Sequence, residues 1–304
     1  METPVNKILL ATAFDSQSLV AFEYAIYFSK LTNAEIVILH VVDKGDFLAR
    51  FFSNEEIEAK AKAKAQEMLE EMILKNKTQL DAPVTTRIEF GKPYQKILEV
   101  AQEIKPRLIM MGKTESATLG KSLLGSNTLH VTCEAIFPIL TVRSIADTIN
   151  FNALNKVIVV PLDLTQRVCE QLSAAIEYGK YLNSAISLVS VLNKKSIGLE
   201  MQLIQELNKA KLAVEKEGLV CKTSLIKNTT EPIHKLIAEY AKNEAAHLLI
   251  IMTQEESSIV KYFVGSTAQE VINQSETPVL SVVPWERDED SIFSNIVDPM
   301  GVIL

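Results

Sequence analysis

The chain has 304 residues, of which 47% are hydrophobic and 23% charged, and its formal net charge is -7 at pH 7. The composition is that of a globular protein, and the length predicts about two domains. The negative net charge argues against the broad basic surface of a nucleic-acid-binding protein, so we expect no nucleic acid among its partners. The longest apolar runs, such as residues 248–252, are too short to cross a bilayer, and no basic, apolar leader precedes the first strand. We therefore expect a cytoplasmic protein with no membrane partner.

The cysteines and histidines show none of the spacings that disulfide frameworks or metal sites require. Cys133, Cys169 and Cys221 are far apart and form no CxxC pair, so we predict three buried thiols. The histidines form no HExxH motif, so we expect no metal site; they are His40, His130, His234 and His247. His40 is predicted to end a strand as a packed or capping residue.

Apolar runs alternate with amphipathic stretches along the first half of the chain. We predict strands at residues 7–12, 35–42, 84–90, 108–111 and 138–143. Helical spacing predicts one helix after Asp15 and further helices near residues 54–77, 93–104 and 126–135. Near-continuous apolar strands that alternate with helices indicate a parallel sheet covered on both faces. Asp15 is predicted to cap the first helix by accepting N–H bonds from its first turn, rather than to act in catalysis.

The order of strands and helices repeats from Lys156 onward. Ala11 corresponds to Pro161 at an offset of 150, whereas Gly125 corresponds to Gly265 at an offset of 140. A loss of residues between elements, with none lost inside the strands, is typical of a shortened connection. The repeat predicts two homologous domains and an apolar tail that docks on the protein surface, at residues 1–145, 155–284 and 285–304.

A loop that leaves the strand 108–111 and opens a helix has the character of an anion site. It starts at Gly112 and ends at Gly125, Ser126 and Asn127. Backbone N–H groups in the first turn of a helix have no partner within the helix, and the helix dipole places partial positive charge there. The turn at 125–127 is therefore predicted to be able to hold a phosphate.

The motifs of both halves resemble those of the universal stress protein family. In the first half they are Ile8-Leu-Leu-Ala-Thr-Ala-Phe-Asp15, Leu39-His-Val-Val-Asp43, Met111-Gly112 with Gly125-Ser126, and Phe137-Pro-Ile-Leu-Thr-Val142. The resemblance covers nearly the whole chain and implies an α/β fold with two Rossmann-like domains of the adenine nucleotide alpha hydrolase-like type. Each domain is expected to be a five-stranded, mainly parallel sheet flanked by helices. The two are expected to pack as a pseudo-twofold intramolecular dimer in which strands 138–143 and 278–283 meet.

Members of this family that bind ATP carry an Asp after the first strand and a loop of the form G-x2-G-x9-G-[ST]. The glycines let the backbone approach the phosphates, and the Asp can hold the ribose hydroxyls. Carried over to the first half, the resemblance implies a site with the base near the first two strands and the phosphates over the loop. Its residues would be Ala11, Thr12, Ala13, Val41, Val42, Met111, Gly112, Glu115, Gly125, Ser126 and Asn127.

Both halves depart from the family's loop pattern. In the first half Glu115 replaces the second glycine and Ala13 replaces the Asp. A carboxylate about 4 Å from a phosphate charge costs roughly 1 to 4 kcal/mol, depending on the effective dielectric constant. We therefore expect the first half to bind an adenine nucleotide only weakly.

The second half is predicted to serve structure or partner binding instead. Thr253 and Glu256 are expected at its glycine positions, in a loop one residue short. Asp163 is retained, but Asp163 or Thr165 is expected to cap the next helix. The equivalents of the nucleotide site are Pro161, Asp163, Val191, Gly265, Ser266 and Thr267.

The sequence favours a regulatory binding protein of the stress response, with ATP or another adenine nucleotide as its ligand. Two alternatives remain open, a slow ATP-hydrolysing enzyme and an interaction scaffold that binds no nucleotide. No general base, nucleophile or metal-binding carboxylate pair is evident in the sequence near either loop, so an enzyme assignment would rest on the resemblance alone. A homodimer of the whole chain and a protein partner are also left open.

Overall fold

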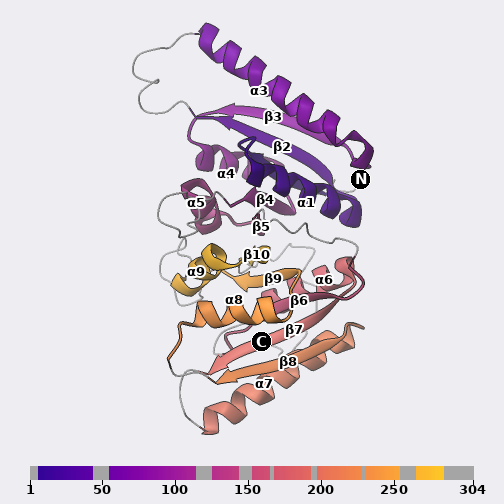
Figure 1. The fold of residues 1–304 in the computed structure, drawn as a ribbon, viewed down its shortest axis with the longest axis vertical. Helices are drawn as coiled ribbons and strands as arrows, with labels where there is room; N and C mark the ends of the chain where they lie inside the picture. Colours follow the sequence, from indigo (N-terminus) through magenta and orange to yellow (C-terminus); the bar gives the residue numbers. More distant parts are fainter. Residues whose placement is uncertain are drawn as a thin grey trace. The chain divides into compact units, whose positions relative to one another are not determined.

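The computed structural model describes residues 6–43, 55–113, 125–143, 153–164, 168–192, 197–227, 230–253 and 265–283. The chain divides into two compact units, Met1–Ala146 and Asp147–Leu304 (Figure 1). We call them the first and the second unit.

The first unit is built on five parallel strands in the order β3-β2-β1-β4-β5. Their bounds are β1 Lys7–Thr12, β2 Glu35–Val42, β3 Val84–Phe90, β4 Leu108–Gly112 and β5 Ile139–Val142. The chain first builds the sheet outward from β1 through β2 to β3, and then returns to add β4 on the other side of β1. Such a reversal leaves a crevice at the carboxyl ends of the two central strands, which is where open α/β sheets bind ligands.

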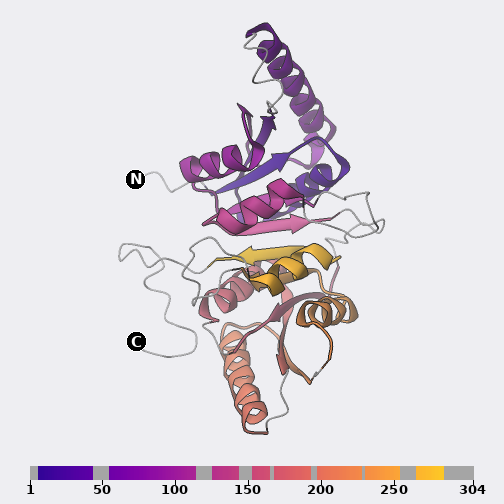
Figure 2. The same ribbon diagram turned by 90° about the vertical axis from the view of Figure 1, so that its left-hand side faces the viewer.

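Helices cover both faces of the first sheet. They are α1 Ser16–Thr32, α3 Glu55–Lys75, α4 Pro93–Ile104 and α5 Ser126–Glu134, with a 3-10 turn at Lys77–Gln79. Helices α1 and α3 lie on one face, and α4 and α5 lie on the other (Figure 1, Figure 2). Alternate strand residues such as Leu9, Val37 and Ile109 form one buried core with Ile97 of α4 and Val131 of α5. This is the period-two pattern of a strand that is buried on both sides.

The cap predicted at the start of α1 is confirmed. The Ser18 backbone N–H donates to the Asp15 carboxylate at 2.8 Å. The helix ends at Thr32, and its C-cap Asn33 has the left-handed backbone conformation common after a helix, with a φ of 50°.

The second unit repeats this design with the strand order β10-β9-β6-β7-β8, again parallel throughout. Its strands are β6 Lys156–Pro161, β7 Ser184–Leu192, β8 Cys221–Lys227, β9 Leu248–Met252 and β10 Val279–Val282. Its helices are α6 Cys169–Leu182, α7 Ile197–Lys216, α8 Ile233–Asn243 and α9 Ser266–Gln274. The C-cap of α6 is Asn183, with a φ of 49°, as that of α1 is Asn33, so the offset of 150 holds at this turn too. The predicted α/β fold with two five-stranded sheets is therefore confirmed.

Several local predictions need correction. Cys221 is buried, but Cys133 and Cys169 are only half-buried, and all three are free thiols. His40 does not end its strand, because β2 continues to Val42. The helix expected near residues 54–77 is α3, Glu55–Lys75.

Candidate functional site

The structure describes most of the residues of the nucleotide site that was predicted in the first half. These residues lie at the carboxyl edge of the first sheet or beside it. Ala11 and Met111 are register partners on β1 and β4, and Val41 and Val42 end the neighbouring β2. Gly125, Ser126 and Asn127 lie at the start of α5, which has no side-chain cap. Glu115, the residue expected to weaken nucleotide binding, lies outside the described residues.

Gly112 has a packing role that the sequence did not suggest. A Cβ atom at this position would lie 2.5 Å from the carbonyl carbon of Gln17 and 2.8 Å from the Ser18 nitrogen. Both are backbone atoms in the first turn of α1, so neither can rotate aside. The glycine is therefore required for α1 to approach the end of β4, whether or not a phosphate binds nearby.

The two glycines that precede α5 and α9 are not required by their backbone conformation. Gly125 has a φ of -56° and Gly265 a φ of -54°, values that any residue can adopt. Each glycine is the N-cap of its helix and provides no side chain to satisfy the first-turn N–H groups. These groups are thus placed as an anion-binding helix end requires.

A pair of aromatic side chains lies beside the end of β1. The rings of Phe14 and His40 have centroids 4.5 Å apart. The Phe14 N–H donates to the Thr12 hydroxyl at 3.1 Å, and His40 Nδ1 lies 2.9 Å from the Thr12 carbonyl oxygen. Phe14 has a φ of 62°, which is uncommon for a bulky residue. The only feature of the sequence that could have indicated this ring contact is an aromatic residue between the end of a strand and the cap of a helix.

Lys113, just after β4, is also buried. Its side chain is 2% exposed, and its backbone N–H donates to the Val142 carbonyl at 2.7 Å. Burial, assisted by the positive charge of Arg143, lowers the pKa of the Lys113 ammonium to about 7.

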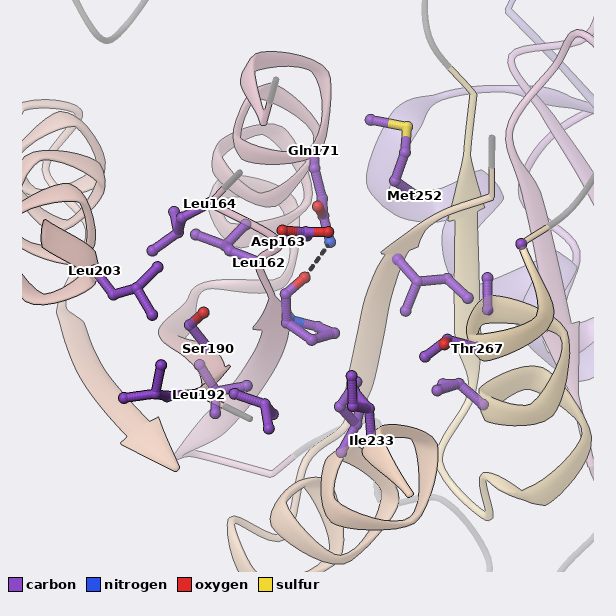
Figure 3. Close-up of a pocket in the computed structure, with 18 of the residues that line it drawn as sticks. Leu162, Asp163, Leu164, Gln171, Ser190, Leu192, Leu203, Ile233, Met252 and Thr267 are labelled. Atoms are coloured by element: carbon purple, nitrogen blue, oxygen red, sulfur yellow. Dashed lines mark hydrogen bonds between the residues drawn. The ribbon is translucent and has the colours of Figure 1, made fainter. Parts of the chain in front are cut away.

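The second unit contains a cavity of about 450 Å³ at the carboxyl edge of its sheet (Figure 3). It begins at the ends of β6, β7 and β9 and extends toward α7, α8 and α9. Of the six second-half candidates only Ser266, the first residue of α9, is not part of the wall. The five that line the cavity are Pro161, Asp163, Val191, Gly265 and Thr267.

Gln171 is a cavity residue that sequence reasoning missed. In the first unit β1 pairs with β4 as far as Ala11 and Met111, whereas the β6–β9 pairing ends at Val159 and Leu249. Pro161 has no N–H and cannot continue the ladder. The buried Gln171 side chain fills the gap, because its Nε2 donates to the Pro161 carbonyl at 2.8 Å (Figure 3) and to the Ile250 carbonyl at 2.9 Å. The feature of the sequence that could have indicated this role is a glutamine on the apolar stripe of α6.

The cavity wall is mostly apolar, with a few polar groups. Asp163 is the one charged residue among the described residues that line it. Thr253 also lines the cavity, and its hydroxyl donates a hydrogen bond to the Val282 carbonyl at 3.2 Å. In Figure 3, Asp163 and Gln171 lie on one side of the cavity and Thr267 lies on the other. The arrangement suits a small ligand with an apolar part and a small number of polar groups.

The structure corrects the predicted correspondence of the two loops. Ile8 pairs with Leu108 and Ile158 pairs with Leu248, so the offset between β4 and β9 is 140. Met252 therefore occupies the place of Gly112, and Thr253 that of Lys113. Because the same offset relates Gly125 to Gly265, the second loop is not one residue short. At this offset Glu255, not Glu256, corresponds to Glu115, and all three lie outside the described residues.

The expected cap of α6 is also wrong. The helix begins at Cys169, its N-cap is Val168, and no side chain caps it. Asp163 therefore does not cap α6, and Thr165 lies outside the described residues. At the offset of 150, α6 starts three positions later than α1, and Asp163 lines the cavity.

Two general features concern the described residues only. None of their helices is long and apolar enough to cross a membrane. Within the same residues, no three His, Cys, Asp or Glu side chains are grouped so that they can hold a metal ion.

Comparison with known proteins gives consistent matches to both units. The model of the universal stress protein family matches residues 4–143 and 155–283. Universal stress protein MJ0531 of Methanocaldococcus jannaschii is 33% identical over 144 residues, which are 47% of this chain and 84% of that protein. The crystal structure of a universal stress protein from Archaeoglobus fulgidus matches 92% of this chain and 99% of its own, with a TM-score of 0.72 at 21% identity.

A further structure, the universal stress protein from Archaeoglobus fulgidus in complex with dAMP, covers 42% of this chain and 97% of its own, with a TM-score of 0.36 at 22% identity. The two segments that the family model matches are consecutive and together cover most of the chain. The chain belongs to the universal stress protein family, as a tandem member with two domains.

Proposed function

We propose that this chain is a regulatory ligand-binding protein of the stress response, and that its ligand is an adenine nucleotide. The observation that carries the proposal is the cavity of about 450 Å³ at the carboxyl edge of the second sheet. Its volume is within the range of small-molecule sites, and it lies beside the strands at which the sheet order reverses. Family membership indicates the adenine class, since a relative from Archaeoglobus fulgidus has been solved in complex with dAMP.

The walls offer a partner for each part of such a ligand. Apolar side chains such as Val191 can pack against the base, and the Asp163 carboxylate can accept hydrogen bonds from the ribose hydroxyls. The uncapped first turn of α9, which starts beside Gly265, can hold a phosphate. Because Asp163 is the one charged group among the described lining residues, we expect ligands with one phosphate to bind better than those with three.

This placement differs from the one that the sequence favoured. The weak nucleotide site expected in the first half stays a prediction. The geometry supports the second unit more strongly, because Asp163 lines a cavity there, whereas the first half has Ala13 at the corresponding position.

Calorimetric titration of the full chain with AMP, ADP and ATP tests the proposal. We expect AMP to bind, and Asp163→Asn to weaken its binding by about tenfold, which is roughly 1.4 kcal/mol, because an amide accepts hydrogen bonds from ribose hydroxyls less strongly than a carboxylate does. The matched control is Glu276→Gln, which removes a carboxylate of the same unit that pairs with Lys242 on the surface. It should leave the affinity unchanged.

Three outcomes discriminate between the possibilities. An unchanged AMP affinity in Asp163→Asn would place the site in the first unit. Absence of binding for all three nucleotides would overturn the proposal and favour the interaction scaffold. Release of phosphate from ATP during the titration would favour the slow hydrolytic enzyme.

A further inference from the structure

The side-chain amide of Gln171 offers only one of its two polar atoms to the second cavity. Both protons of its Nε2 are engaged, because this nitrogen donates to the Pro161 carbonyl at 2.8 Å and to the Ile250 carbonyl at 2.9 Å. The opposite orientation of the amide would set Oε1 against two carbonyl oxygens with no proton between them. The amide is therefore fixed with its nitrogen toward the strands, and its oxygen remains for the cavity that the residue lines.

The Gln171 oxygen has no partner within the part of the chain that the structure describes. Each hydrogen bond that this side chain makes to described residues starts from Nε2, although the residue is only 3% exposed. A buried acceptor without a donor is costly, and a bound molecule that donates to it recovers that free energy. The oxygen thus marks a point of the cavity wall at which a ligand should carry a donor.

A second acceptor belongs to the same wall. The Asp163 carboxylate also lines the cavity, and Figure 3 shows Asp163 and Gln171 on the side opposite Thr267. An ionised carboxylate accepts hydrogen bonds and donates none. A phosphate does not suit this wall, because its oxygens are acceptors and its charge is repelled by Asp163. Two acceptors on one wall match a ligand that carries two neighbouring donors.

An adenine nucleotide carries such donors on its sugar. The amino group of adenine offers one nitrogen, whereas ribose offers two hydroxyls on adjacent carbons. Each hydroxyl can donate one hydrogen bond, so one can donate to the Asp163 carboxylate and the other to Gln171 Oε1. The ribose is therefore the part of the nucleotide that fits this wall.

The first unit has no acceptor side chain at either corresponding position. At the offset of 150, which holds at the C-caps of α1 and α6, Gln171 corresponds to Ala21. Asp163 corresponds to Ala13 at the same offset. The pair of acceptors is therefore a property of the second unit, and the first unit's side chains at these positions cannot reproduce it.

We infer that Gln171 and Asp163 together select a ligand with hydroxyls on two adjacent carbons, which for an adenine nucleotide means the ribonucleotide and not its deoxy forms. The inference rests on the proposed function for the presence of the nucleotide. It adds the sugar specificity of the site and the direction of the ligand. The ribose lies at the wall formed by Asp163 and Gln171, and the phosphate lies toward the first turn of α9.

Calorimetric titration of the full chain with AMP and with its 2′-deoxy and 3′-deoxy analogues tests the inference. We expect the wild type to bind AMP about tenfold more tightly than either analogue, because each analogue leaves one buried acceptor without its donor. Gln171→Met keeps nearly the length of the side chain and removes the acceptor. It should abolish the preference for AMP over one analogue and retain the preference over the other, which depends on Asp163.

The matched control is Gln274→Met. Gln274 is an exposed residue at the end of α9, and its Nε2 donates to the Glu270 carboxylate at 2.9 Å. This variant should keep both preferences of the wild type. Circular dichroism and a thermal melt establish that each variant is folded.

The outcomes separate this inference from the proposed function. Equal affinities of the wild type for AMP and either analogue would overturn the inference and leave the proposed function intact. A folded Gln171→Met variant that binds all three ligands more weakly by the same factor would show a structural role only, and would also overturn the inference. Absence of AMP binding would overturn both. If Gln171→Met does not fold, the comparison of the three ligands on the wild type still decides.

Discussion

Burial changes the chemistry of Lys113. Its ammonium has an ordinary pKa of 10.5 when solvated, and burial beside Arg143 lowers the pKa to about 7 in the folded chain. The folded state therefore binds fewer protons than the unfolded state between these two values. The contribution of Lys113 to the free energy of unfolding must therefore increase with pH in that interval. Below pH 7 this contribution is constant, because Lys113 is protonated in both the folded and the unfolded state.

We therefore expect the free energy of unfolding to contain a contribution from Lys113 that rises from pH 7 toward pH 9. The steepest slope for one proton is about 1.4 kcal/mol per pH unit. Urea unfolding at pH 6, 7, 8 and 9 measures it, and Lys113→Met should remove the contribution. Lys62→Met, which changes an exposed lysine on α3, is the control and should retain the wild-type slope. Equal slopes in the wild type and Lys113→Met would contradict the prediction.

At the scale of elements, the start of the first helix distinguishes the two units. Helix α1 begins at Ser16 and its first turn approaches Gly112, whereas α6 begins at Cys169, and Met252 is at the position that corresponds to Gly112. Packing against α1 therefore accounts for the glycine at this position of the first unit.

Gly112→Ala should destabilise the first unit by about 1–3 kcal/mol, because the new methyl group would overlap the Gln17 carbonyl group. Gly198→Ala is the matched control. A Cβ atom at Gly198, on the first turn of α7, would meet no atom within 4 Å, so the change should be neutral or should stabilise by up to about 1 kcal/mol. Chemical denaturation measures both. Equal stability of the two variants would show that the α1 contact does not require glycine.

Much of the fold could be predicted from the sequence because apolar runs and helix signals agreed. Strands 7–12, 35–42 and 84–90 have the predicted bounds, and α4 starts at the predicted Pro93. The loop correspondence was wrong because it was matched by glycine motif, whereas strand register decides it. No local pattern reveals the two hydrogen bonds from Gln171 to neighbouring strands, or the ring contact of Phe14 with His40. These interactions join residues that are distant in the sequence.

At the scale of the whole molecule, the predicted pairing of strands 138–143 and 278–283 across a pseudo-twofold axis stays a prediction. In the structure these are β5 and β10, and each ends the strand order of its own unit. Both are apolar, and an unpaired apolar edge strand promotes aggregation.

Hydrogen exchange on the full chain tests this pairing. If the two edges pair, the β5 amides that do not bond to β4 should exchange as slowly as the amides of β4, and the same should hold for β10 and β9. The outer edges β3 and β8 provide the internal reference for a strand with one neighbour in its unit. Exchange at β5 and β10 as rapid as at these outer edges would contradict the prediction.

The Gln171 amide offers a spectroscopic view of the second cavity. Both of its hydrogen bonds come from one nitrogen, to the carbonyls of Pro161 and Ile250, and the side chain is 3% exposed. Side-chain amide protons of a solvated glutamine exchange rapidly with water, whereas buried and bonded protons exchange slowly. The two Nε2 protons should therefore give separate, long-lived resonances in a proton–nitrogen correlation spectrum. Because Gln171 lines the cavity, the protein carries an intrinsic reporter that requires no attached label.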